Sequence, residues 1–175
     1  MPNLRRSLAV VAALSLAAIT CGAAQSQTAP ADPNNVVQIY VDGLLNGWTF
    51  SGWAAKKPET PVDNGMKPVV LSMAGWADFG FKSPTPINLK AYKTLSFAVY
   101  LTGHGKQQIN VTARLNGKDV SKMKVLQGPK GEWFEIDQDI KEMHVQGDGM
   151  VDEFYFKNPD GTALEDWYID NVQLQ

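Results

Sequence analysis

The chain has 175 residues, with 16 Lys and Arg against 18 Asp and Glu, for a net charge of −2. This length suits one domain with a sizeable core and does not comfortably supply two. A mildly acidic chain without a basic tract lacks the electrostatic footprint of a protein that binds nucleic acid or an anionic membrane. We therefore expect neither as a partner.

The N-terminal end has the organisation of a secretory signal peptide, which we assign to residues 1–24. Arg5 and Arg6 form a positive segment, residues 8–19 form an apolar run, and small residues follow as far as Ala24. The apolar run is too short to span a bilayer. We predict cleavage near Ala24 and a secreted or periplasmic protein without membrane insertion.

Cleavage would change both the charge and the redox chemistry of the chain. It removes two Arg and Cys21, the one cysteine, which leaves 14 Lys and Arg against 18 Asp and Glu and a net charge of −4. Cys21 also raises the alternative of a lipoprotein, but Thr20 before it fits a lipobox poorly. The mature protein then has no disulfide, so a hydrophobic core or a metal must stabilise it. Residues 25–35 are rich in Gln, Ala, Pro and Asn and predict a disordered linker.

Residues 36–175 consist almost entirely of short segments with strand periodicity. Within 94–101, Leu95, Phe97, Val99 and Leu101 alternate with other residues and share one face. Helix is expected only over 88–92 and 138–143. The predicted strands cover residues 36–41, 48–53, 69–73, 76–82, 94–101, 108–116, 119–126, 132–137, 150–157 and 167–174.

Turn residues separate these segments at short intervals. Asn116-Gly117 predicts a two-residue hairpin, and Ser83-Pro84-Thr85-Pro86 predicts a break after the fourth strand. About ten short strands at such spacing, many with one polar face, favour an all-β fold. We predict one antiparallel two-sheet β-sandwich of the jelly-roll type over residues 36–175.

The sequence supports few kinds of catalytic site. His104 and His144 are the only histidines, and they show no spacing typical of zinc ligands. No Gly-x-Ser-x-Gly motif and no phosphate-binding glycine loop is present. These observations argue against a zinc hydrolase, a serine hydrolase with this motif and a nucleotide-binding enzyme.

One acidic segment leaves an enzymatic alternative open. Alternation places Glu135, Asp137 and Asp139 on one face of a strand, and glycosidases use paired carboxylates. The segment partly resembles the Glu-Ile-Asp-x-x-Glu motif of jelly-roll β-glucanases, but it lacks the final glutamate. A small glycoside hydrolase that uses Glu135 and Asp137 is therefore the second hypothesis.

Three other segments, in order along the chain, carry a stronger resemblance. They are Ile39-Tyr40-Val41-Asp42 with Gly47-Trp48 and Trp53, then residues 87–97 (INLKAYKTLSF), and finally residues 167–174 (WYIDNVQL). Together they resemble non-catalytic carbohydrate-binding modules of the jelly-roll, galactose-binding-like type. The resemblance implies a binding protein for a polysaccharide or another glycan, with no enzymatic activity, and does not identify the sugar.

The same resemblance implies a structural metal. In such modules an aspartate of the last strand often helps to hold calcium near the beginning of the domain. Asp170 matches that position, and Asp42 is its expected partner. Calcium takes six to eight oxygen ligands, so two carboxylates would form only part of its coordination. A pair of turn-forming acids is the alternative.

Periodicity also sorts the aromatic residues into core and surface. Phe79 and Phe81 share one face, as do Phe154 and Phe156, and we assign these four rings to the core. One of Trp48 and Trp53 should also be buried, because they lie on opposite faces of a regular strand. If the strands concerned are neighbours, the outward residues meet on one sheet face. The candidate ligand-binding residues are Trp76, Asp78, Asn110, Arg114, Tyr155, Trp48 and Trp53.

This combination matches the chemistry of a sugar. A sugar ring presents C–H groups on its face and hydroxyls at its rim, so it needs an aromatic plane together with amide, carboxylate or guanidinium groups. We therefore predict a monomeric glycan-binding module that uses one sheet face. A protein-binding adhesive module that uses the same face is a third hypothesis.

Overall fold

The computed structural model describes residues 36–57, 66–102, 108–126, 129, 131–159, 161–164 and 166–175. The predicted signal peptide, the predicted linker and His104 lie outside these ranges. The described residues form twelve strands and two short 3-10 helices, η1 (Leu89–Ala91) and η2 (Lys141–Met143). None of the helices in this part of the chain is long and apolar enough to cross a membrane.

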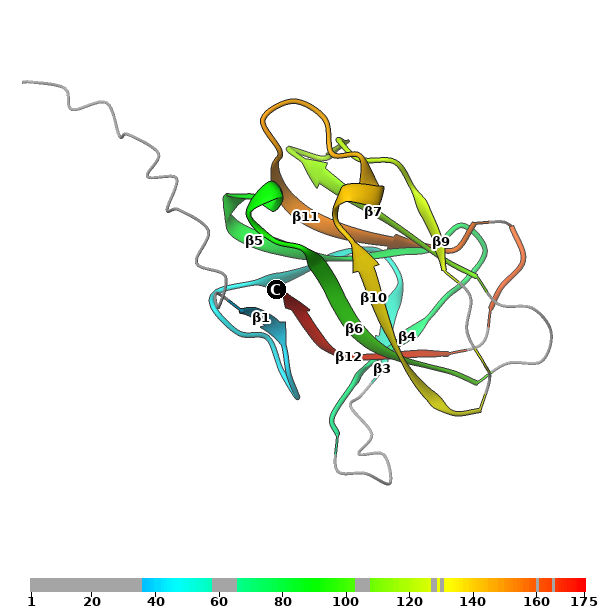
Figure 1. The fold of residues 1–175 in the computed structure, drawn as a ribbon. Coiled ribbons are helices and arrows are strands. Elements are labelled where there is room, and N and C mark those ends of the chain that lie inside the picture. Colours follow the sequence, from blue (N-terminus) through cyan, green and yellow to red (C-terminus); the bar gives the residue numbers. More distant parts are fainter. Residues whose placement is uncertain are drawn as a thin grey trace, which may run out of the picture.

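The strands form two antiparallel sheets that face each other in a sandwich (Figure 1). The helical turns predicted over residues 88–92 and 138–143 are present as η1 and η2, each three residues long. Sheet A has the order β10 (Trp133–Asp139), β6 (Thr94–Leu101), β12 (Trp167–Leu174), β4 (Val69–Ser72) and β3 (Ala55–Lys57), and β1 (Val37–Tyr40) also pairs with β12. Sheet B has the order β2 (Thr49–Gly52), β5 (Asp78–Asn88), β11 (Met150–Lys157), β7 (Ile109–Leu115) and β8 (Lys118–Asp119), and β9 (Lys124–Leu126) also pairs with β7. The predicted all-β sandwich is thereby confirmed.

Aromatic rings from both sheets fill the space between them. Phe97 of sheet A meets Phe156 of sheet B edge-to-face, with the ring centroids 5.2 Å apart. Tyr40 of sheet A lies 5.9 Å from Phe81 of sheet B. Edge-to-face and tilted pairs of this kind add to the stabilisation that burial itself provides. The core assignment is confirmed, since the side chains of Phe79, Phe81, Phe154 and Phe156 are all buried.

The two tryptophans that flank β2 divide between core and surface, as their opposite parity predicts. Trp48 is 4 % exposed and stacks on Phe154, whereas Trp53 is 58 % exposed. Thr49–Gly52 separates them as a short strand whose last residue, Gly52, has a left-handed φ of 83°. Trp167, the first residue of β12, is fully buried as well.

The predicted break over residues 83–86 is wrong. β5 continues through both prolines to Asn88, and its pairing with β11 slips there: Lys82 is opposite Glu153, and the next pair is Ile87 opposite Val151. A proline cannot donate a ladder hydrogen bond, but a bulge does not require one. The irregular register therefore lets the strand pass through residues that ordinarily end it.

The Asn116-Gly117 turn is confirmed. Both residues have positive φ, 52° and 75°, and they connect β7 to β8. A two-residue hairpin turn of this kind needs φ above zero at both positions, which asparagine and glycine tolerate best. This turn returns the chain beside β7 and keeps Arg114 opposite Asp119.

The contrast between Trp48 and Trp53 predicts very different losses of stability when each ring is removed. Trp48→Ala should lower the free energy of unfolding by about 3–5 kcal/mol, because it empties a buried ring position. Trp53→Ala is the matched control, and its effect should stay within about 0.5 kcal/mol. Urea unfolding of both variants provides the measurement, and similar losses in the two would contradict this placement.

Candidate functional site

The outward residues of three adjacent strands meet on one face of sheet B. β11 lies between β5 and β7, as the convergence hypothesis required. Tyr155 lies opposite Gly80 on one side and Thr112 on the other, while Lys157 lies opposite Asp78 and Asn110. Since side chains alternate across a strand, these residues share the solvent side of the sheet. We call this surface the sheet B face.

A stacked pair stands at the centre of the sheet B face. The guanidinium carbon of Arg114 lies 3.1 Å from the centroid of the Tyr155 ring. The Nε atom of Arg114 donates to Asp119 at 2.6 Å, and its Nη1 atom lies 3.9 Å from the Glu153 carboxylate. Two acidic residues therefore hold the guanidinium plane over the ring, which a flexible ammonium would not reproduce.

The ionisation of this pair reflects its surroundings. Burial, together with a hydrogen bond to the Asp78 carboxylate, raises the pKa of Tyr155 to about 12, against an opposing effect of Arg114. Burial works to lower the pKa of Arg114, but hydrogen bonds to Asp119 and Tyr155 outweigh it and leave that pKa above its ordinary value. The phenol is therefore neutral and the guanidinium charged at physiological pH.

A buried carboxylate beside the pair on the same face supports it. Glu153 is 7 % exposed and accepts a short hydrogen bond from the Ser51 hydroxyl of β2, in addition to its ion pair with Arg114. Gly80 of β5 leaves room for this contact, because a Cβ there would lie 2.4 Å from Ser51 Oγ and 2.9 Å from Glu153 Oε1. A buried charge needs such partners to be tolerated.

Two exposed tryptophans flank the polar centre at the end of the sheet where β2 ends and β5 begins. Trp53 and Trp76 are 58 % and 56 % exposed. The backbone N–H of Trp53 donates to Asp78 Oδ1 at 3.1 Å, and the ammonium of Lys157 lies 5.8 Å from the Trp76 ring centroid. Asp78 and Lys157 face each other across the two strands, so they connect both indoles to the Tyr155 region.

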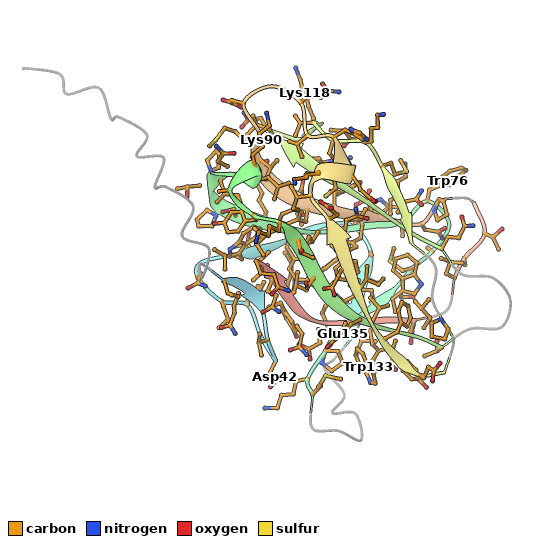
Figure 2. The ribbon with its side chains drawn as sticks, viewed as in Figure 1. Asp42, Trp76, Lys90, Lys118, Trp133 and Glu135 are labelled. Atoms are coloured by element: carbon orange, nitrogen blue, oxygen red, sulfur yellow. The ribbon has the colours of Figure 1, made fainter. Side chains whose placement is uncertain are left out.

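Hydrogen bonds support the turn that carries Trp76, the residue labelled in Figure 2. Trp76 has a left-handed backbone, with φ of 63°, and the N–H of Ala77 donates to the carbonyl of Ala74 across the turn. The fully buried Asn158 side chain donates to the carbonyls of Ala74 and Thr162 at 3.0 Å and 2.8 Å. This amide joins the Trp76 turn to the chain segment that follows β11.

Two of the predicted residues do not present their side chains on this surface. Trp48 is in the core, so the prediction that it contacts a ligand is corrected: its ring packs on Phe154 instead. Asn110 lies in the predicted row but is 7 % exposed, and its Oδ1 atom has no hydrogen-bond partner among the described residues. Trp53, Trp76, Asp78, Arg114 and Tyr155 remain together at the surface.

Sequence reasoning did not include three residues that complete the sheet B face. Glu153 and Lys157 share the parity of Tyr155 on β11, so the alternation alone could have identified them. Ser51 had no comparable signal. Its hydroxyl reaches Glu153 only because β2 and β11 both pair with β5.

The two aspartates expected to bind calcium lie together at a corner of sheet A. Asp170 Oδ1 accepts hydrogen bonds from the backbone N–H groups of Asp42, at 3.2 Å, and Asn171, at 2.7 Å. Asp42 Oδ1 accepts one from the N–H of Lys67 at 2.6 Å. Among the described residues there is no group of three or more His, Cys, Asp or Glu that could hold a metal. The oxygen donors present suit calcium in type, and further ligands would have to be carbonyls or water.

The acidic segment of the enzymatic hypothesis lies on the other sheet. Glu135, Asp137 and Asp139 are all exposed on β10, as their parity predicts. Asp137 Oδ1 accepts a hydrogen bond from Ser96 Oγ at 2.5 Å, and Asp139 Oδ1 accepts one from the N–H of Lys141 at 2.8 Å. None of the three belongs to the sheet B face. His144 is an exposed residue after η2.

Comparison with known protein families finds no match, and comparison with curated proteins also finds none. The fold, however, is similar to solved structures. A substituted family 29 carbohydrate-binding module aligns with a TM-score of 0.56 at 15 % identity, over 81 % of this chain and 91 % of that one. A second substituted family 29 module, solved with mannohexaose, aligns with a TM-score of 0.52 at 16 % identity, over 80 % of this chain and 90 % of that one.

A family 11 carbohydrate-binding module points to the same architecture. That protein, from Clostridium thermocellum and in complex with a β-1,3-1,4-mixed-linked tetrasaccharide, aligns with a TM-score of 0.55 at 16 % identity. The alignment covers 79 % of this chain and 95 % of that one. Identities this low establish a shared fold only. Carbohydrate-binding modules of the architecture that the three sequence segments predicted are therefore among the structural neighbours.

Proposed function

We propose that this protein is an exported, monomeric, non-catalytic module that binds a polysaccharide on the sheet B face. The indoles of Trp53 and Trp76 supply planes for the C–H faces of sugar rings. Between them, Asp78 accepts hydrogen bonds from hydroxyls, while Arg114 and Lys157 donate them. The predicted signal peptide supports export, and the fold shared with carbohydrate-binding modules supports the class of ligand.

The backbone of Trp76 is the observation that carries this proposal. A left-handed φ of 63° in a non-glycine residue costs on the order of 1 kcal/mol, and the indole remains 56 % exposed. The fold gains little from a strained residue whose ring is more than half exposed. A ligand that stacks on the ring gives the position a physical purpose, and the buried Asn158 holds the turn ready for it.

The same surface favours an extended neutral chain over a small charged ligand. Its groups are spread over three strands and two turns, and its charges are mixed: Asp78 and Glu153 against Arg114 and Lys157. Two of the neighbours hold a mixed-linked tetrasaccharide and mannohexaose, which are neutral oligosaccharides. We therefore propose neutral, linear, hexose-based polysaccharides as the class of ligand.

Removing the Trp76 ring should weaken this binding without unfolding the protein. Trp76→Ala should reduce affinity for mixed-linked glucan or mannan oligosaccharides by roughly tenfold or more, because a stacking plane is lost. Trp76→Phe should restore part of the affinity. Isothermal titration calorimetry on the mature protein provides the measurement.

Val36→Ala is the matched control, since Val36 is also an exposed apolar side chain, at 48 %, and lies just before β1 of sheet A. It should leave binding unchanged. Unaltered affinity in a folded Trp76→Ala variant would show that this site assignment is wrong. Release of reducing ends that stops in Glu135→Gln would favour the hydrolase hypothesis instead.

The raised pKa of Tyr155 predicts its behaviour at alkaline pH. The folded pKa of about 12 exceeds the ordinary value near 10, so the folded state holds this proton more tightly. Its contribution to stability is fully present below about pH 10 and is lost as the pH rises toward about 12. Burial also raises the pKa of Tyr92, so an ultraviolet phenolate titration should show a late-titrating component that is reduced by one tyrosine in Tyr155→Phe. A complete titration near pH 10 would contradict the described burial.

The proposed calcium at Asp42 and Asp170 is tested by its removal. Asp170 is fully buried, and a cation would compensate the desolvation of its carboxylate. A metal bound only by the native state raises stability, so EGTA should lower the melting temperature of the wild type. Asp170→Asn should abolish that response. An identical melting temperature with calcium and with EGTA would remove the metal from the proposal.

A further inference from the structure

The outer face of sheet A carries a second set of aromatic rings. Tyr100 of β6 lies opposite Trp133 of β10 and Tyr168 of β12, and its ring centroid is 5.7 Å from each of theirs. All three residues are partly exposed. They form a continuous aromatic row across three strands, on the side of the sandwich opposite to the sheet B face.

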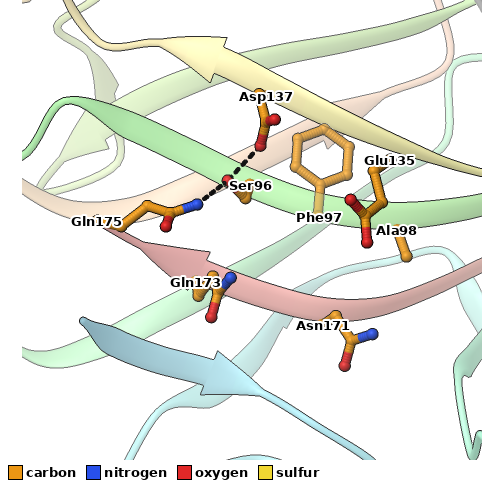
Figure 3. A pocket seen from close by; sticks show the side chains of 8 residues that line it. All are labelled: Ser96, Phe97, Ala98, Glu135, Asp137, Asn171, Gln173 and Gln175. Carbon is orange, nitrogen blue, oxygen red and sulfur yellow. Dashed lines mark hydrogen bonds between the residues drawn. The ribbon is translucent and has the colours of Figure 1, made fainter.

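A polar hollow follows this row along the same strands. Ala98 lies two residues before Tyr100 on β6 and is paired with Glu135 of β10. Ser96 lies two residues before Ala98 and is paired with Asp137 of β10 and Gln173 of β12. The small Ala98 side chain leaves space between larger ones. The hollow measures about 120 Å³ and is lined by Ser96, Phe97, Ala98, Glu135, Asp137, Asn171, Gln173 and Gln175 (Figure 3).

Hydrogen bonds within the hollow hold one side of it in place. Gln175 Nε2 donates to Ser96 Oγ at 2.7 Å, and Ser96 Oγ donates to Asp137 Oδ1. Glu135 stands between this chain of hydrogen bonds and the aromatic row, on an exposed position of β10. The irregular pairing of β12 between Asp170 and Gln173 brings Asn171 to the opposite wall.

The charge of the hollow differs from that of the sheet B face. Its described lining contains two carboxylates and three carboxamides and no Lys or Arg, whereas the sheet B face contains both Arg114 and Lys157. Carboxylates accept hydrogen bonds from hydroxyls and attract ammonium groups, and they repel carboxylate-bearing ligands. Rings beside such a rim are complementary to a sugar that carries no acid group.

We propose that the outer face of sheet A is a second sugar-binding site. Trp133, Tyr100 and Tyr168 provide the stacking surface, while Glu135, Asp137 and Gln173 bind the rim of the sugar. The occupant is a non-acidic sugar chain, with amino sugars preferred over neutral sugars because Glu135 and Asp137 attract their ammonium groups. Tyr100 and Ser96 lie four residues apart on β6, roughly 13 Å, so the aromatic row and the hollow together have room for more than one sugar ring. This site rests on its own residues and does not require ligand at the sheet B face.

Indole N–H signals in NMR spectra can test the two faces separately, because Trp133 reports on sheet A and Trp76 on sheet B. Mature Trp76→Ala protein would be titrated with a fully deacetylated glucosamine oligomer, with mannohexaose and with an oligogalacturonate. The Trp133 signal should shift with the first two and stay in place with the acidic oligomer. Glu135→Gln should lower the affinity for the glucosamine oligomer by about tenfold and the affinity for mannohexaose by less.

Glu132→Gln is the matched control, since Glu132 is an exposed glutamate just before β10 and does not line the hollow. When added to Trp76→Ala, it should leave the affinities for the glucosamine oligomer and for mannohexaose unchanged. Trp133→Ala with Trp76 intact should keep the Trp76 response, so failure of the sheet B proposal would be recognised independently.

Several results would overturn the inference. One is a Trp133 signal that shifts with neither non-acidic probe. Another is binding of the oligogalacturonate as tight as that of the glucosamine oligomer, and a third is unchanged affinity of Glu135→Gln for the glucosamine oligomer. Self-association that disappears in Trp133→Ala would assign this face to a second copy of the chain. Release of reducing ends would assign it to hydrolysis. If Trp133→Ala does not fold, the titration of Glu135→Gln with the glucosamine oligomer still tests the proposal.

Discussion

Ring contacts between the two inner sheet faces are the constraint on which the rest of the molecule depends. Phe97 meets Phe156, and Tyr40 meets Phe81, across the sandwich. Because side chains alternate along a strand, burial of each of these rings commits its neighbours to the solvent side. Phe154 and Phe156 thus orient Tyr155, and Phe97 orients Ser96 and Ala98. A slip of one residue in any central strand would bury polar groups and expose the core.

The polar groups of the sheet B face are ordered before any ligand arrives. Ser51, Glu153, Arg114 and Tyr155 form a connected series of hydrogen bonds, an ion pair and a stack, and Asp78 joins it through the Tyr155 phenol. Side chains held in this way lose little conformational freedom on binding. The same order applies to Trp76, whose turn is tied to Asn158. These features distinguish a preorganised surface from a chance collection of exposed polar residues.

The two outer faces of the sandwich share an architecture and differ in charge. Each combines partly exposed aromatic rings with hydrogen-bonding groups from three adjacent strands. The sheet B face includes cations, whereas the described lining of the sheet A hollow is acidic and amide-rich. Two faces of different charge on one small module could bind two sugar chains at once, and such bivalent attachment raises effective affinity when the geometry allows both contacts.

The sequence by itself determined most of the strands and the division of aromatic residues into core and surface, because period-two burial is a local property of the chain. It placed Phe79, Phe81, Phe154 and Phe156 inside, and it identified four of the polar and aromatic residues that now surround Tyr155. It also predicted a break at Pro84 and Pro86, and it left the choice between Trp48 and Trp53 open. Only the tertiary structure decided these points, together with the strand order that brings β5, β11 and β7 side by side and the contact of Ser51 with Glu153. Strand order and bulges arise from pairing between segments far apart in the chain, so no local pattern encodes them.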